Sequence, residues 1–206
     1  MELYIEIIGV IVGLLYLWFE YKASIYLWIT SIIMPVVYIF VFYNAGLYAD
    51  FGINVYYLLI AVYGWIKWKY GTAMRVRIHK KEGGVKENDR SLELPISKVP
   101  YRQIILLILV FIISFLVIVW ILKNFTNSDV PWCDSFTTAM SIIGMWMLAQ
   151  KYIEQWFVWI VVDVVSVALY IYKDLYPTAS LYGLYAIIAI FGYIKWKKLM
   201  LEERSK

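Results

Sequence analysis

The sequence predicts an all-α membrane protein whose chain crosses the bilayer seven times. Its 206 residues are 63% hydrophobic and 19% aromatic, which excludes an ordinary soluble domain. The apolar runs are unbroken and many approach the roughly 20 residues that a spanning helix needs, whereas a transmembrane β-barrel needs alternating segments of about ten residues. Charged residues fall between these runs, so the spans can be counted and ordered.

The first three candidate spans precede the only long polar segment. They run from Ile5 to Phe19, within Ala23 to Ala49, and from Phe51 to Ile66. The third is short, but Trp65 near its end is an amphipathic ring of the kind found at membrane interfaces. The polar segment, Lys67 to Arg102, contains the glycine and proline residues typical of a linker.

Four further spans follow: Gln103 to Leu122, Ser135 to Gln150, Trp156 to Tyr172 and Leu175 to Ile194. With seven spans, 17 of the 19 Lys and Arg residues fall on one side of the membrane. Because cationic loops stay in the cytoplasm, this asymmetry predicts a cytoplasmic C-terminus and an external N-terminus. The net charge of +4 then reflects topology and contact with anionic lipid rather than a nucleic-acid partner.

An internal repeat divides the chain. The segment Gly13–Trp28 matches Gly144–Trp159 and pairs the two tryptophans that end them, and Gly64–Lys69 matches Gly192–Lys197. Since four spans separate matching helices, both copies face the same way, which gives a 3+1+3 parallel repeat. We expect one three-helix copy at residues 1–70, a cytoplasmic linker with a connecting helix at 71–130, and the second copy at 131–206.

Cysteine and histidine are too scarce for most catalytic or metal sites. Cys133 is the only cysteine and His79 the only histidine, so the chain cannot form an internal disulfide or a metal cluster of these residues. A membrane enzyme would need at least a pair of positioned reactive groups, and the carboxylate inside the sixth span has no charged partner within the membrane. We therefore expect no enzyme activity, metal or cofactor.

That carboxylate lies near the middle of the sixth span. Eight uncharged residues, from Gln155, precede Asp163 and nine follow it, to Tyr172. A helix that crosses the bilayer therefore holds Asp163 close to the midplane. An ionisable group there costs roughly 2.5–3.5 kcal/mol and by default indicates a functional site.

One face of the same helix combines this carboxylate with aromatic rings. Trp156, Trp159, Asp163, Val167 and Tyr170 follow one another at helical spacing. Aromatic faces attract organic cations by about 0.5–2 kcal/mol each, and a carboxylate supplies the countercharge that a buried cation requires. The pattern indicates a site for a flat, positively charged organic molecule. For the tryptophans, packing against lipid or other helices is the alternative.

These residues resemble the PnuC-type vitamin transporters. The resemblance is carried by Lys151-Tyr-Ile-Glu-Gln-Trp-Phe-Val-Trp-Ile-Val-Val-Asp163, by Tyr63-Gly-Trp-Ile-Lys-Trp68 and by the 3+1+3 plan. It implies an architecture similar to the SWEET sugar transporters, a place in the bacterial inner (cytoplasmic) membrane, and a homotrimer. It also implies facilitated diffusion of a vitamin that is retained by intracellular phosphorylation.

Within that family the sixth span looks most like the thiamine branch, PnuT. The nicotinamide riboside branch carries Asn where this chain has Asp163 and Gln155, and Gln where we place Asn54. A fixed carboxylate suits a permanent cation that lacks ribose hydroxyls, such as the thiazolium of thiamine. Nicotinamide riboside, itself cationic, a flavin, and a vitamin-binding subunit without transport activity are the alternatives.

The candidate binding residues have distinct expected roles. Trp156 and Trp159 would flank an aromatic ring, Asp163 would meet the thiazolium or the aminopyrimidine, and Asn54 would form a hydrogen bond from the other half. Trp28, as the repeat partner of Trp159, is a candidate for the opposite wall, with packing as its alternative. Tyr170 would act as a gate or a packing residue. The full set is Trp156, Trp159, Asp163, Asn54, Trp28 and Tyr170.

Overall fold

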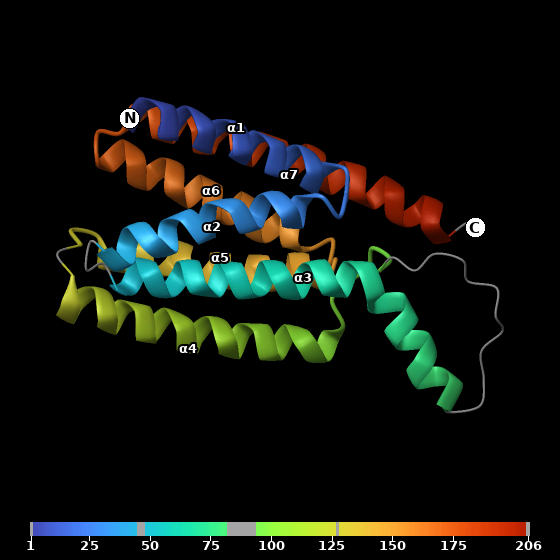
Figure 1. Cartoon of the computed structure of the whole chain (residues 1–206). Coiled ribbons are helices and arrows are strands. Elements are labelled where there is room, and N and C mark those ends of the chain that lie inside the picture. Colours follow the sequence, from blue (N-terminus) through green and yellow to red (C-terminus); the bar gives the residue numbers. More distant parts are fainter. Residues whose placement is uncertain (1, 45–47, 82–93, 127, 205–206) are drawn as a thin grey trace. The chain divides into compact units, whose positions relative to one another are not determined.

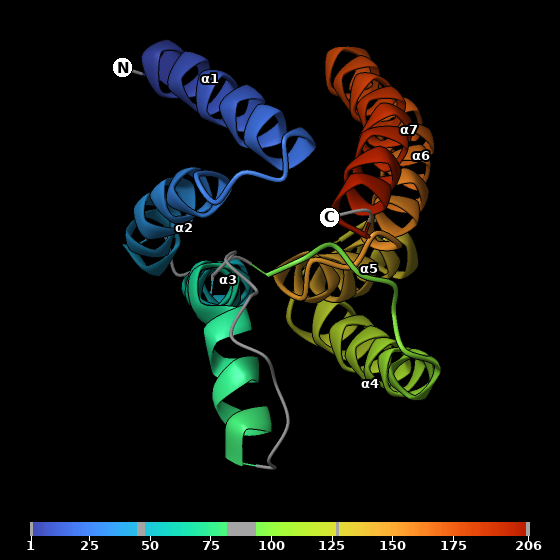
Figure 2. The same ribbon diagram turned by 90° about the vertical axis from the view of Figure 1, so that its right-hand side faces the viewer.

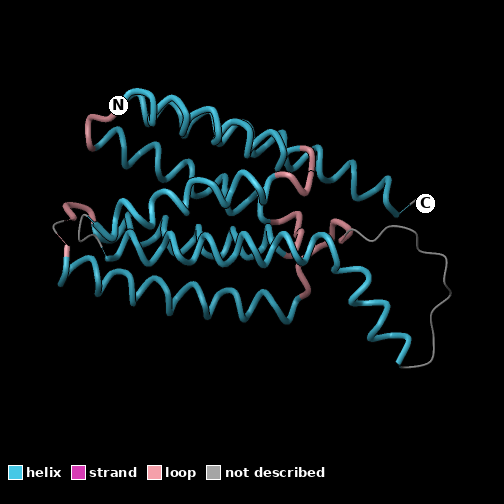
Figure 3. The backbone as a smooth tube through the Cα atoms, in the orientation of Figure 1, coloured by secondary structure: helices cyan, strands magenta, loops and turns pink. Residues whose placement is uncertain are grey.

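The computed structural model describes residues 2–44, 48–81, 94–126 and 128–204. Within them the chain is helical and contains no strand, only one isolated bridge between Ser97 and Tyr152 (Figure 1 and Figure 3). The helices are α1 (Glu2–Tyr21), α2 (Leu27–Asn44), α3 (Tyr48–Lys81), α4 (Tyr101–Phe125), α5 (Pro131–Ala149), α6 (Gln155–Tyr172) and α7 (Tyr176–Arg204).

Each of these helices overlaps one predicted span. The largest differences are at α3 and α7, which continue through the charged residues that end their apolar runs. Of the described helices, α4, α6 and α7 are long and apolar enough to cross a membrane by length and composition. The sevenfold crossing, its sidedness and the parallel repeat stay predictions. Gly83 and Gly84, expected in the linker, lie outside the described residues.

The chain divides into two compact units. Unit 1 holds α1–α3 and the segment up to Ile96, with the turn Ala149–Lys151 and the end of α7 from Leu199. Unit 2 holds Ser97–Leu148 and Tyr152–Lys198, and thus α4, α6 and most of α5 and α7. Within unit 1, α2 lies beside both α1 and α3 (Figure 2). The division into two three-helix copies around a connecting helix stays a prediction.

Helix α4 is the least covered of the apolar helices. It packs on α5 through aromatic pairs, with ring centroids 5.7 Å apart for Phe111 and Phe136 and 5.9 Å apart for Phe115 and Trp132. Only 6% of its apolar window is buried, although its mean hydropathy is 3.5. A helix so apolar and so exposed within the described structure has the length and composition of a membrane span.

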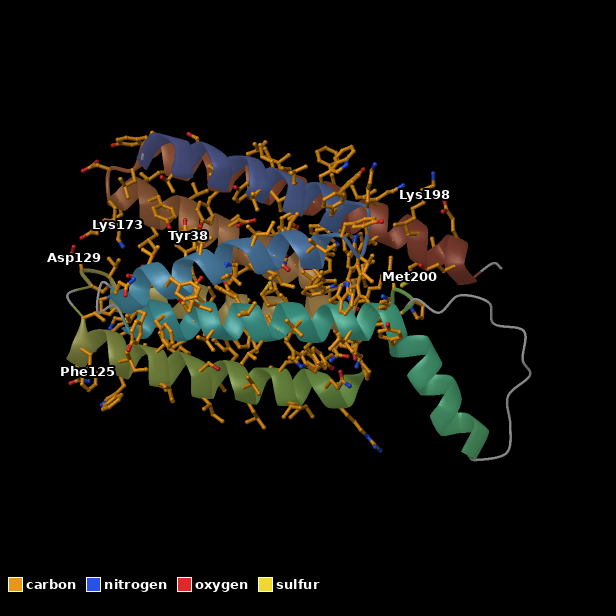
Figure 4. All side chains as sticks on the ribbon, viewed as in Figure 1. Tyr38, Phe125, Asp129, Lys173, Lys198 and Met200 are labelled. Atoms are coloured by element: carbon orange, nitrogen blue, oxygen red, sulfur yellow. The ribbon has the colours of Figure 1, made fainter. Side chains whose placement is uncertain are left out.

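The two ends of unit 2 carry different groups. Phe125, Asp129 and Lys173 lie at one end and Lys198 lies toward the other (Figure 4). At the first end, Lys173 forms a 3.5 Å ion pair with Asp134 and thereby ties the end of α6 to the start of α5.

An extended segment before α4 is held by hydrogen bonds within each unit. In unit 1, the amide of Leu94 donates to the Trp68 carbonyl at 3.1 Å, and the amide of Ile96 donates to the Glu203 carboxylate at 3.0 Å. We call residues 94–99 the strap. Its first half is thereby fastened to the ends of α3 and α7.

The second half of the strap is fastened in unit 2. The amide of Ile153 donates to the Ser97 carbonyl at 3.0 Å, and the amide of Val99 donates to the Glu154 carboxylate at 3.0 Å. Glu154 directly precedes α6, so the strap fixes the place where the candidate binding helix begins.

Candidate functional site

Helix α6 lies between two turns, each of which contains a residue with positive φ. Before it, Lys151 adopts a left-handed backbone with φ of 59°, and the Tyr152 amide donates to the Met147 carbonyl at 3.0 Å. After it, Asp174 adopts φ of 58°. Between these turns the valine- and isoleucine-rich run is helical because a helix satisfies every backbone group internally, as an apolar environment demands.

Asp163 is buried in this helix. Its exposure is 6%, and within the described ranges no hydrogen bond, ion pair or metal-binding cluster includes it. Its electrostatic neighbours are Tyr182 and Tyr185 of α7. A carboxylate in this setting is expensive unless something compensates it. The absence of a basic neighbour in the described structure leaves the carboxylate available to a cationic ligand.

Three further side chains on α6, Gln155, Trp156 and Trp159, have buried polar atoms without a hydrogen-bond partner in the described structure. Gln155 is fully buried, and neither amide atom has a hydrogen-bond partner; the indole nitrogen of Trp159 is likewise buried and unpaired within the described structure. The Trp159 ring lies against Gly144, where an added Cβ would come within 3.2 Å of it. Buried polar groups are nearly always hydrogen-bonded, so these atoms mark a place for a ligand or water.

Trp156 occupies a packed helix interface. It is 1% exposed, and its ring meets Trp196 edge to face at 5.6 Å and 88°. A Cβ on Gly192 would collide with the same ring. Trp156 therefore holds α6 against α7. Its contact with a ligand stays a prediction, and Trp159 is the tryptophan of the pair that keeps partial exposure.

Unit 1 contains the same contact. Trp28 is fully buried, meets Trp68 edge to face at 5.5 Å and 88°, and occupies the space where Gly64 lacks a Cβ. The same interval along the chain separates Trp28 from Trp156, Gly64 from Gly192 and Trp68 from Trp196. It also separates Ala23 from Lys151, which both adopt positive φ, 51° and 59°.

This geometry corrects one detail of the sequence alignment, which paired Trp28 with Trp159. By its contacts, Trp28 corresponds to Trp156. The error arose because α6 has two tryptophans three residues apart, nearly one helical turn, so either alignment preserves the aromatic spacing. Trp28 is consequently a packing residue of unit 1, and its role as a wall of a binding site stays a prediction.

The other candidates lie in both units. Asn54 is buried in α3 of unit 1, at 8% exposure, and the repeat interval relates it to Tyr182. Tyr170 lies against Tyr182 with ring centroids 5.1 Å apart and planes at 34°. The described contacts thus favour packing for Tyr170. The participation of Asn54 in binding stays a prediction.

The sequence did not predict three residues as candidates for the site. These are Gln155 on α6 and Tyr182 and Tyr185 on α7. The sequence singles out Gln155 only as a departure from the nicotinamide riboside branch. The two tyrosines stand three apart in the last span, so their common helical face was a usable signal.

Comparison with known proteins identifies the family. The pattern of the nicotinamide mononucleotide transporter family matches residues 3–198. The chain belongs to this family. It is therefore a multi-pass membrane transporter of the PnuC family of vitamin transporters, and not an enzyme.

Its named relatives carry different vitamins. The nicotinamide riboside transporter PnuC of Escherichia coli is 22% identical over 182 residues, covering 78% of this chain and 71% of its own. PnuC of Neisseria mucosa is 25% identical over 162 residues, covering 75% and 57%. The riboflavin/roseoflavin transporter RibM of Streptomyces davaonensis is 22% identical over 192 residues, covering 93% and 83%.

A solved structure supports the fold. The crystal structure of the vitamin B3 transporter PnuC superposes with a TM-score of 0.64 at 24% identity, covering 93% of this chain and 79% of that one. At this identity the likeness establishes the fold alone. The expected thiamine branch is supported by none of these relatives' names, and the nicotinamide riboside alternative is supported better.

Proposed function

We propose that this PnuC-family protein carries a vitamin that is a permanent aromatic cation, by facilitated diffusion. The observation that carries the proposal is the buried Asp163, which has no cationic partner within the described structure. A neutral cargo would leave that charge uncompensated. Rocking of two three-helix copies would expose the site alternately to each side. Intracellular phosphorylation would retain the vitamin.

Two cationic vitamins are candidates, and different observations favour each. The names of the relatives favour nicotinamide riboside. Asp163, in place of the Asn expected for that branch, favours thiamine, because an amide recognises ribose hydroxyls whereas a carboxylate recognises a charge. On the physics of the site thiamine is our first choice and nicotinamide riboside the second. A riboflavin-like cargo is disfavoured because it is neutral.

Each of the candidate residues on α6 would contact a different part of the vitamin or support a residue that does. Asp163 would pair with the cation, the partly exposed Trp159 would stack on an aromatic ring, and the unpaired amide of Gln155 would bond a polar edge of the vitamin. Trp156 would hold Trp159 in place through its packing on α7. We also propose a homotrimer, as the family resemblance implies; the mass of the detergent-purified protein tests this.

Thermal unfolding of the purified protein tests the cargo. Thiamine, nicotinamide riboside and riboflavin are added separately to the parent and to Asp163→Asn. A ligand present at 100 times its Kd stabilises the folded state by about 2.7 kcal/mol. We expect stabilisation by one or both cations and little by riboflavin, and we expect Asp163→Asn to reduce the effect of thiamine most.

A matched control is Asp129→Asn, which neutralises an exposed carboxylate at one end of unit 2 (Figure 4). It should leave every ligand response unchanged. Equal stabilisation of the parent by riboflavin and the cations, or an unchanged thiamine response in Asp163→Asn, would contradict the proposal.

A further inference from the structure

Helices α6 and α7 pack antiparallel within unit 2, and their contacts define which residues lie at the level of Asp163 (Figure 1). Near one end of the pair, the rings of Phe157 and Tyr193 lie 4.6 Å apart. Nearer the other end, a Cβ on Gly183 would contact Val167 at 3.9 Å. Asp163 lies between these contacts, and the register places Tyr185 within about one helical turn of its level.

Tyr185 belongs to a row of tyrosines. Its ring lies 5.6 Å from that of Tyr182, which in turn lies 5.1 Å from that of Tyr170. Tyr182 and Tyr185 both lie within range of the charge of Asp163, whereas the described structure places no Lys or Arg there. The groups that α7 offers to the carboxylate are therefore neutral hydroxyls. A tyrosine hydroxyl can donate one hydrogen bond to a carboxylate.

A facilitator has a step that makes such donors necessary. After it releases its cargo, the unloaded protein must reorient with nothing bound. In this protein Asp163 stays buried during that step without its cation. Burial of an unpaired carboxylate costs free energy, and hydrogen-bond donors reduce that cost. The loaded protein does not face this cost, because the cation compensates the charge.

We propose that Tyr182 and Tyr185 are positioning residues whose hydroxyls turn to donate hydrogen bonds to Asp163 while the unloaded transporter reorients, and that they release it to the vitamin cation on binding. The inference rests on the proposed function, because it takes Asp163 as the cation site. Tyr185 is the principal donor, since the hydroxyl of Tyr182 also interacts with Tyr170. If the tyrosines served only as a packed aromatic row, phenylalanine would replace them without consequence.

Two transport modes in proteoliposomes separate the unloaded step from the rest of the cycle. Net uptake of labelled vitamin into empty vesicles requires return of the unloaded protein. Exchange of external labelled vitamin for internal unlabelled vitamin does not. The free energy of a hydrogen bond to a charged group corresponds to a change in rate of about tenfold or more. We therefore expect Tyr182→Phe with Tyr185→Phe to slow net uptake about tenfold while exchange stays within about twofold of the parent.

The control is Tyr193→Phe, which removes a hydroxyl from the same helix at the Phe157 contact. It should change neither mode. Each single variant should slow net uptake in the same direction, with Tyr185→Phe the larger. Equal losses in net uptake and exchange, or no loss in either, would overturn the inference.

The parent protein separates this inference from the proposed function. Parent vesicles are first assayed with labelled thiamine and labelled nicotinamide riboside. If neither cation enters, the proposed function fails and this inference fails with it. If one enters and the tyrosine variants behave as the parent does, only this inference fails.

Discussion

Gly192 and Gly64 are the residues at which a single methyl group should matter most. A Cβ at Gly192 would meet the Trp156 ring, and one at Gly64 would meet the Trp28 ring. Both rings are fully packed, and overpacking costs typically about 1–3 kcal/mol. We expect Gly192→Ala and Gly64→Ala to lower the thermal midpoint of the detergent-purified protein.

Each of these substitutions has a control on its own helix. Gly183, on α7, would gain only an ordinary contact at 3.9 Å, and Gly52, on α3, has nothing within 4 Å. Alanine there should be neutral or stabilising, because glycine in a helix costs roughly 0.5–1 kcal/mol relative to alanine. Equal effects of Gly192→Ala and Gly183→Ala would show that the Trp156 contact is not tight.

The candidate site could be predicted in part. Asp163 and Trp159 follow from one span, because helical spacing places them on one face and the apolar run places the carboxylate near the midplane. The spacing of Tyr182 and Tyr185 shows that they share a helical face, but it could not place that face beside Asp163, because the contact depends on the register between two helices. Gln155 required coordinates, since an unpaired amide can be recognised only when its surroundings are known.

At the scale of elements, the apolar runs predicted where helices lie but not how long they are. The third run ends at Ile66, yet α3 continues to Lys81. Charged residues end a stretch that lipid can cover, but Lys and Arg are good helix formers and do not end a helix. α7 continues beyond Ile194 to Arg204 for the same reason.

The strap gives a prediction for its two carboxylates. Glu203 accepts from the Ile96 amide and Glu154 accepts from the Val99 amide, both at 3.0 Å. Glutamine is a weaker acceptor than an ionised carboxylate, and charge-assisted bonds are roughly twice as strong as neutral ones. We expect Glu203→Gln to speed hydrogen–deuterium exchange at Ile96 and Glu154→Gln to speed it at Val99.

The two variants serve as controls for each other, because each carboxylate holds a different half of the strap. Mass spectrometry with fragmentation that separates residue 96 from residue 99 reports each amide. Faster exchange of both amides in either variant would mean that the strap opens as a single piece. Unchanged exchange in both would mean that the carboxylates do not hold it.

At the scale of the whole molecule, the matching contacts argue for duplication more strongly than the sequence alignment did. A buried tryptophan, a glycine without room for a Cβ and a second tryptophan at 88° occur once in each unit at the same interval. The candidate ligand groups do not follow this symmetry. At the repeat interval Asp163 aligns with Pro35, so the proposed second copy has a carboxylate at a position where the proposed first copy has none.

That asymmetry fixes how transport should respond to ions and voltage. Asp163, which has no ion pair within the described structure, offers little means of coupling to sodium or protons. We expect uptake into proteoliposomes to be unchanged by an imposed sodium or proton gradient when the membrane potential is held at zero.

A cationic cargo should nevertheless respond to voltage, because 100 mV is worth about 2.3 kcal/mol per charge. An inside-negative potential of about 100 mV should therefore raise the equilibrium accumulation of vitamin by roughly 50-fold. Acceleration by either gradient at zero potential would contradict facilitated diffusion, and accumulation indifferent to voltage would contradict a cationic cargo.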